Sequence, residues 1–361
     1  MKDPKVGILI DSNMYRMLKT GKDFYEKFSF YEEAANEIDL DICYFRLEDV
    51  NFDSCTTSVL IRNKAGLLVT KEIKIPKVIH NRALFSTRLA NGIINLSKMG
   101  YCIFNEMNKI GKWKVHSLLM KNQDLLPHLP ETVSANQENL VRMLEKYEKI
   151  IIKPINGGLG RGIISISKKE DQTWIVHYNQ QRGKPFEEIV FSNKLPKIIT
   201  EKLNRGYIIQ QRIPLATYKG NPFDLRVSVQ KNGLAIWQVT GIVAKVASPG
   251  GYVTNVARGG ECISFSKILE DYPHLDAKTI LSRIERLSVK AMQVLSSHYS
   301  NLADVGLDIG ITNEGFPMFI ECNGRDLRYS FGAAGMHDVW KEAYATPIRY
   351  AQYLLNISET M

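Results

Sequence analysis

The sequence predicts an α/β domain at the N-terminus, followed by an α+β region rich in antiparallel hairpins. In residues 1–108, short apolar strands alternate with helical segments, the pattern of a parallel α/β unit. Beyond them, many strands follow one another through turn-forming residues instead. A chain of 361 residues, 44% of them hydrophobic, can bury a sizeable core and favours two or three domains or subdomains.

The N-terminal elements follow from apolar runs and helical spacing. The expected strands are Lys5–Ile10, Asp41–Arg46, Lys77–His80 and Tyr101–Phe104, the expected helices are Phe24–Ile38 and Thr87–Met99, and Thr57–Ile73 is expected as an inserted hairpin. His80-Asn81-Arg82 comes at a strand's carboxyl end, where open α/β sheets bind ligands. A loop cap with a surface arginine is an equally good interpretation, and both stay open.

The elements downstream are read in the same way. The expected helices are Lys112–Met120, Asn136–Tyr147, Ser282–Ser297 and Trp340–Leu355, and the expected strands are Glu131–Ser134, Tyr207–Ile213, Asp224–Gln230 and Leu234–Val239, with a further strand-like GIVAKVA.

A glycine-rich loop, Gly157–Gly162, lies between two apolar strands within Lys149–Ser167. Its four glycines in six residues, with Arg161 among them, can expose backbone N–H groups and let a polyphosphate approach closely. The loop lacks the GK[ST] of a Walker loop, so we expect a hairpin lid, although a floppy hairpin tip would also explain the glycines. Lys153 ends the preceding apolar strand, where a buried charge needs a partner.

A second hairpin predicts a metal site. Val305–Thr312 and Pro317–Asn323 read as strands, joined by residues 313–316. That loop length places Asp308 directly opposite Glu321, and Asn323 shares their face. Two carboxylates and an amide suit Mg²⁺, which completes its shell with water and phosphate oxygens. The alternative is a solvated polar face on an ordinary hairpin.

A glycine-containing loop after GIVAKVA gathers groups suited to an anion. Lys245, Asn255, Arg258 and Gly259-Gly260 supply cations, an amide and close backbone approach. An exposed basic loop is the alternative. The net charge of +9 also favours anionic partners, although Lys and Arg are spread along the chain.

Composition bounds the location of the protein. The five cysteines show no CxxC spacing and their number is odd, which favours reduced thiols in the cytoplasm. No apolar run approaches the length of a membrane span, and Asp11 ends the first one too early for a signal peptide. We therefore expect a cytoplasmic protein. The family resemblance described below adds an association with the spore to this expectation.

The ordered series KP…GGxGRG, YIIQQRI, DLRV, the NxxxGG loop and D…ECN resembles the ATP-grasp superfamily over residues 109–330. VIHNR, KWKVHSLL, LPET, IIKPINGGLGRG, NPFDLRVSVQKN and GIVAKVA resemble one branch, the YheC/YheD-type family linked to endospore coats. The resemblance implies a preceding α/β domain in residues 1–108, a lid subdomain in 109–205 and a core subdomain with the metal site in 206–361.

The resemblance also implies roles for individual residues. For ATP these are Lys114, Lys153, Gly157, Gly158, Gly160, Arg161, Gly162, Gln210, Gln211, Arg212 and Ile213; for Mg²⁺ or Mn²⁺ they are Asp308, Glu321 and Asn323; for the transferred phosphate they are Arg226 and Lys245. Asn255 and Arg258, in the glycine-containing loop, are expected to bind the carboxylate substrate or its acyl phosphate. Lys245 stands where many relatives carry arginine, so it lacks the bidentate fork of a guanidinium.

The implied activity is an ATP-dependent ligase that joins a carboxylate to an amine, such as an amino acid or peptide, through an acyl phosphate. The first alternative is a spore-associated ATP-binding protein with an assembly role. The second is a nucleic-acid-binding module, which the absence of a basic helix or an aromatic-basic stripe in the sequence disfavours. The identity of the substrates and the oligomeric state are not predicted.

Overall fold

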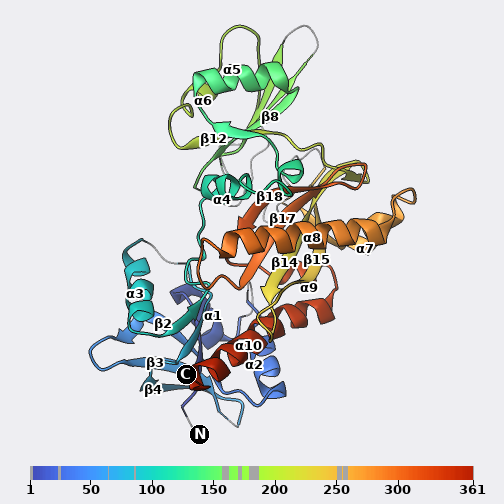
Figure 1. The fold of residues 1–361 in the computed structure, drawn as a ribbon. Coiled ribbons are helices and arrows are strands. Elements are labelled where there is room, and N and C mark those ends of the chain that lie inside the picture. The colour runs from blue at the N-terminus through green and yellow to red at the C-terminus, as the bar shows by residue number, and fades with distance from the viewer. Residues whose placement is uncertain are drawn as a thin grey trace.

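The computed structural model describes residues 3–22, 26–63, 65–84, 87–156, 162–169, 173–178, 187–249, 254 and 259–360. The described residues form three sheets, which Figure 1 shows stacked along the length of the molecule. The N-terminal sheet lies at one end, the sheet around the glycine-rich loop at the other, and the sheet that carries the predicted metal hairpin between them. The expected fold class is confirmed.

The N-terminal sheet has the order β4-β3-β2-β1-β5-β6. Its strands are β1 (Val6–Leu9), β2 (Ile42–Asn51), β3 (Thr56–Arg62), β4 (Leu68–Lys74), β5 (Val78–Asn81) and β6 (Cys102–Phe104), and its helices are α1 (Ser12–Thr20), α2 (Phe28–Glu37) and α3 (Thr87–Lys98). The central strands pair in parallel, as expected. The hairpin β3–β4 is not an insertion outside the sheet, because β3 pairs with β2 and extends it.

The second sheet has the order β11-β10-β9-β8-β12-β7. It consists of β7 (Thr132–Ser134), β8 (Lys149–Pro154), β9 (Ile164–Lys168), β10 (Trp174–Tyr178), β11 (Glu187–Phe191) and β12 (Tyr207–Gln211), with α5 (Gln137–Lys146) and α6 (Lys197–Thr200). The apolar side chains of α5 and the strands form one core. Asn136 accepts a hydrogen bond from the Asn139 backbone and caps α5 where the sequence places its start.

The third sheet has the order β16-β15-β14-β17-β18, and β13 pairs with β14. Its strands are β13 (Thr217–Tyr218), β14 (Asn221–Lys231), β15 (Trp237–Val246), β16 (Glu261–Ser264), β17 (Asp304–Ile311) and β18 (Pro317–Asn323), and its region holds α4 (Lys112–Leu119), the 3₁₀ helix η1 (Leu126–His128), α7 (Phe265–Glu270), α8 (Ala277–Ser296) and α9 (Tyr329–Ala333). The strand expected at 234–239 and the separate GIVAKVA strand are one element, β15, which begins at Trp237.

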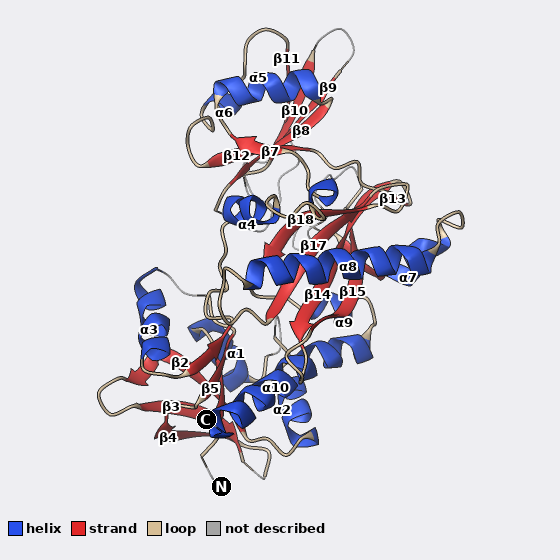
Figure 2. Cartoon of the chain, in the orientation of Figure 1, coloured by secondary structure: helices blue, strands red, loops and turns tan. Residues whose placement is uncertain are grey.

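Two helices pack away from their neighbours in sequence. Figure 2 shows α8 lying along the third sheet and α4 between that sheet and the second. The apolar face of α4, with Val115 and Leu119, joins the core of the third sheet. The C-terminal helix α10 (His337–Thr360) instead packs Tyr344 and Ile348 onto Ile8 and the other core residues of the N-terminal domain.

Candidate functional site

A pocket opens where α4, β8, β12 and β18 meet. Polar groups from all four elements line it: Lys112, His116, Lys153, Gln210, Glu321 and Cys322. The second and third sheets thus each contribute to one site. This is the region in which the sequence places the phosphate-binding lysine and the metal-binding hairpin.

Lys153 is held in this pocket by a neutral amide. Antiparallel pairing of β8 with β12 brings Lys153 beside Gln210, and the Lys153 Nζ donates a hydrogen bond to Gln210 Oε1 at 2.8 Å. Gln210 Nε2 donates in turn to Thr132 Oγ1 at 2.7 Å, which fixes the amide. Burial, and secondly the charge of Lys112, lower the pKa of Lys153 to about 8. An anion at this contact would stabilise the ammonium.

Lys112, not Lys114, lines the pocket. Two residues along an α-helix correspond to a rotation of about 200°, so the two lysines lie on opposite faces of α4. Lys114 is exposed, whereas the Lys112 Nζ forms an ion pair with Glu321. Burial alone would raise the pKa of Glu321, but Lys112 and then Lys153 hold it below its ordinary value.

His116 is a pocket residue that the sequence reasoning missed. It lies one turn after Lys112 on the same face of α4. Burial and the charge of Lys153 lower the pKa of His116 to about 4, so the ring is neutral near pH 7. Its Nε2 has no hydrogen-bond partner within the described part of the chain. The i, i+4 spacing from Lys112 was the available signal.

The hairpin pairs Asp308 with Glu321, as predicted, but through a different local geometry. The turn is one residue longer than expected, because Ile311 pairs with Pro317. A β-bulge at Ile320 then restores the register, so that Asp308 faces Glu321. The two carboxylates therefore lie side by side, and Asn323 Nδ2 donates to Glu321 Oε1 at 3.3 Å.

Basic side chains converge on Asp308 from β14 and β15. Arg226 Nε donates to Asp308 Oδ1 at 2.9 Å, and the Lys245 Nζ lies 3.0 Å from the same oxygen. Lys245 also lies 3.0 Å from Asp224 Oδ1. Burial alone would lower the pKa of Lys245, but Asp224 and Asp308 raise it, so the ammonium is kept charged. The Thr254 hydroxyl donates to Asp224 Oδ2.

The donor set of the hairpin fits a hard divalent cation. Asp308, Glu321 and Asn323 offer carboxylate and amide oxygens on one face, and these are Mg²⁺ ligands. Among the described residues, no group of three or more His, Cys, Asp or Glu side chains forms a metal site. The two carboxylates and one amide of the hairpin would leave most positions around such a cation to water and phosphate oxygens.

Asp326, in the segment after β18, positions Arg226. Arg226 Nη1 donates to Asp326 Oδ1 at 3.1 Å, and the Ser228 hydroxyl donates to Asp326 Oδ2. A Cβ at Gly306 would lie 2.4 Å from the Asp326 carboxylate, so only glycine leaves room for this contact. The sequence analysis missed Asp326, although it follows the ECN motif closely.

His80-Asn81-Arg82 belongs to a buried charge cluster. Asn81 Oδ1 accepts from the Ala83 backbone, so the expected loop cap is present, but the expected surface arginine was wrong because Arg82 is buried. Arg82 is fully buried and donates through Nε and Nη2 to Glu26 at 3.0 and 2.9 Å. His80 Nε2 lies 3.0 Å from Asp304 Oδ2, which also accepts from Arg328. The cluster joins the N-terminal domain to β17 and to the segment after β18.

The other expected site residues either do not line this pocket or lie outside the described residues. Gln211 Oε1 accepts from the Glu131 backbone, and Arg212 Nη1 donates to Ser165 Oγ at 3.3 Å. Neither these nor Ile213 lines the pocket described above. Gly162 is described, with a φ of 70° that favours glycine. Gly157, Gly158, Gly160, Arg161, Asn255 and Arg258 lie outside the described residues.

A family described as YheC/D-like ATP-grasp matches residues 100–354 of this chain. The chain belongs to the YheC/D-like ATP-grasp family. Two relatives from Bacillus subtilis (strain 168) are similar along most of their length. The endospore coat-associated protein YheD is 25% identical over 97% of this chain and 79% of its own, and YheC is 25% identical over 90% and 91%.

Solved structures share the ATP-grasp fold. The ATP-grasp ligase PsnB, complexed with a phosphomimetic variant of its minimal precursor, Mg and ADP, has a TM-score of 0.54 at 13% identity and covers 95% of this chain and 98% of its own. The D-cycloserine synthetase DcsG has a TM-score of 0.51 at 12% identity, covering 95% and 99%. The predicted family and fold are therefore confirmed.

In the part of the chain that is described, no helix has the length and apolar character of a membrane span.

Proposed function

We propose that this YheC/D-like ATP-grasp protein is an ATP-dependent ligase that joins a carboxylate to an amine. The observation that carries the proposal is the convergence of three lysines and two carboxylates from separate elements. Lys112, Lys153 and Glu321 line one pocket, and Asp308 and Lys245 adjoin it across the β17–β18 pair. ATP with Mg²⁺ would supply the phosphoryl group that turns the substrate carboxylate into an acyl phosphate.

The residues of the chain have distinct tasks in this proposal. Lys153 and Lys112 bind phosphate oxygens, and Gln210 holds Lys153 in place. Asp308, Glu321 and Asn323 would hold the metal. Lys245 and Arg226 would stabilise the negative charge of the transferred phosphoryl group. The amine of the second substrate is the nucleophile. The glycine-rich loop at 157–162 would serve as a lid that excludes water, which would hydrolyse the acyl phosphate.

Asn255, Arg258 and the neighbouring glycines would bind the carboxylate substrate in the same proposal. Thr254, the described residue beside them, contacts Asp224 in the Lys245 cluster. We expect a cytoplasmic protein whose carboxylate and amine substrates include an amino acid or a peptide, since the solved ligase PsnB binds a precursor. We propose no nucleic-acid or membrane partner.

A second candidate is an ATP-binding protein with a structural role in the spore. The first observation in its favour is that the relatives are endospore coat-associated proteins. The second is that both hairpin carboxylates already form ion pairs, Glu321 with Lys112 and Asp308 with Lys245 and Arg226. Formation of ADP from ATP and Mg²⁺, with and without mixtures of carboxylates and amines, separates the two. Stimulated ADP formation supports a ligase. Nucleotide binding with no ADP formation supports the structural role.

Replacing Lys112 should weaken ATP binding, whereas replacing Lys114 should not. Lys112→Met removes a pocket cation and a charge-assisted contact, so we expect the Kd for ATP to rise about tenfold or more. Lys114→Met changes an exposed residue on the opposite face of the same helix and serves as the matched control. Isothermal titration calorimetry measures both. A weaker affinity in Lys114→Met alone would show that Lys114, and not Lys112, binds ATP.

The affinity for ATP should fall as the pH rises above about 8. The pKa of Lys153 is about 8 without ligand, and the phosphate charge of bound nucleotide should raise it. Binding must then take up a proton where free Lys153 is neutral, and the affinity decreases with pH in that range. Calorimetry in buffers of different ionisation enthalpy measures the uptake. Lys153→Met should abolish it, and an unchanged uptake in this variant would exclude Lys153 as the source.

A further inference from the structure

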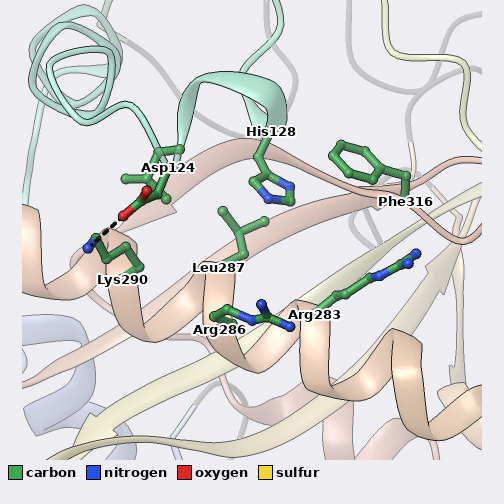
Figure 3. Close-up of a pocket in the computed structure, with 8 residues that line it drawn as sticks. Asp124, His128, Arg283, Arg286, Leu287, Lys290 and Phe316 are labelled. Carbon is green, nitrogen blue, oxygen red and sulfur yellow. Dashed lines mark ion pairs between the residues drawn. The ribbon is translucent and has the colours of Figure 1, made fainter.

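A cavity of about 530 Å³ adjoins α8 on the third sheet. Its walls are α8, the η1 turn and the turn between β17 and β18, as Figure 3 shows. The cavity and the nucleotide pocket have no lining residue in common among those described. The proposed ligase activity therefore does not account for the residues of this cavity.

The floor of the cavity is apolar and held in place. Leu125 and Leu287 are buried, and Phe316 is half-buried. The rings of Phe316 and His128 stack in parallel with their centroids 4.7 Å apart. His128 Nδ1 lies 2.7 Å from the Pro317 carbonyl oxygen, so Nδ1 carries the hydrogen and the ring orientation is fixed. The floor offers a preformed surface for an apolar side chain.

Three cations border this floor along one face of α8. Arg283, Arg286 and Lys290 follow one another at intervals of three and four residues, and Figure 3 shows them along one side of the cavity. Like charges at these spacings destabilise a helix by a few tenths of a kcal/mol per pair, so helix stability does not explain them. Lys290 is paired with Asp124 at 2.9 Å, whereas Arg283 and Arg286 form no ion pair with any described carboxylate.

We propose that this cavity binds an acidic peptide segment in an extended conformation. Arg283 and Lys290 are seven positions apart, a helical rise of about 10 Å, so several anionic groups spaced along a chain match the three cations better than a single carboxylate or phosphate. Successive acidic side chains of an extended chain cover that distance. The guanidinium groups bind carboxylates bidentately, and an apolar side chain of the segment packs between Leu287 and Phe316. Within the chain, Asp124 already binds one of the three cations, Lys290, through its carboxylate.

The test uses a fluorescein-labelled peptide in which glutamates alternate with leucine and phenylalanine. Fluorescence anisotropy with the full chain should show saturable binding that weakens as salt is added. Arg283→Glu/Arg286→Glu should weaken binding by about tenfold or more, because two ion pairs are replaced by repulsion. Lys278→Glu, an exposed reversal on the same helix outside the cavity, is the matched control and should retain affinity.

Other outcomes overturn the proposal. Equal binding of a peptide with glutamine in place of glutamate would show that charge is not recognised. Competition by inorganic phosphate at similar affinity would identify a small-anion site, and tighter binding of a single-stranded oligonucleotide would identify a nucleic-acid surface. Retained peptide binding in the double variant would place the peptide elsewhere. Because ADP formation is measured separately, failure here leaves the ligase proposal standing.

Discussion

Glu321→Gln is expected to lower the rate of phosphoryl transfer by about 100-fold or more. The substitution keeps the size of the side chain and its hydrogen bonding but removes one of two negative charges that face each other across β17 and β18. The metal would bind less tightly, and Lys112 would lose the carboxylate it pairs with. Single-turnover measurement of ADP formation at saturating Mg²⁺ gives the rate of this step directly.

Asp39→Asn is a suitable control for a lost surface carboxylate, since Asp39 lies in the exposed turn after α2. It should leave the rate unchanged. Circular dichroism and the unfolding midpoint establish that Glu321→Gln remains folded. An unchanged rate in Glu321→Gln would show that the hairpin does not hold the metal needed for catalysis.

Arg82→Met should destabilise the folded chain by about 3–5 kcal/mol. The guanidinium is fully buried and binds Glu26 at 2.9 Å and Asp304 at 3.3 Å. Methionine keeps an unbranched apolar stem but carries no charge, so it leaves these buried carboxylates with one positive partner fewer. Denaturation in guanidinium chloride, followed by circular dichroism, measures the loss.

Arg46→Met is the matched control for this measurement. Arg46 forms a two-point ion pair with Asp49, but its side chain is partly exposed. An exposed pair contributes about 0–1 kcal/mol, so the loss should be small. Losses of equal size in Arg82→Met and Arg46→Met would contradict the structural role that we assign to the buried cluster.

The fold was predictable where local pattern decides it. Apolar runs mark the strands of all three sheets, and Asp11 and Asn136 cap the helices that follow them. The pairing of Asp308 with Glu321 was also right, although the longer turn and the bulge at Ile320 cancel each other in the register. Alternation in the sequence shows which residues share a face, but it does not show where a strand gains an extra residue.

The candidate site was predictable only in part. Lys153 and Gln210, which the family resemblance assigns separately to ATP, lie together in the pocket. The resemblance points to Lys114, whereas Lys112 lines the pocket from the opposite face of α4, and a family position alone does not show which face of a helix a residue occupies. The buried cluster of His80 and Arg82 could not be foreseen, because its partner Asp304 lies more than 200 residues away. Long-range contacts of this kind arise from tertiary packing.

The central claim is that this ATP-grasp protein forms an amide bond through an acyl phosphate. Mass spectrometry after incubation with ATP, Mg²⁺ and a cell metabolite extract tests it most directly. We predict ADP and phosphate together with a product whose mass equals a carboxylate plus an amine less one water, and with Glu321→Gln all three should form more slowly, by about 100-fold or more. Formation of AMP and pyrophosphate, or nucleotide binding with no condensed product, would contradict the claim.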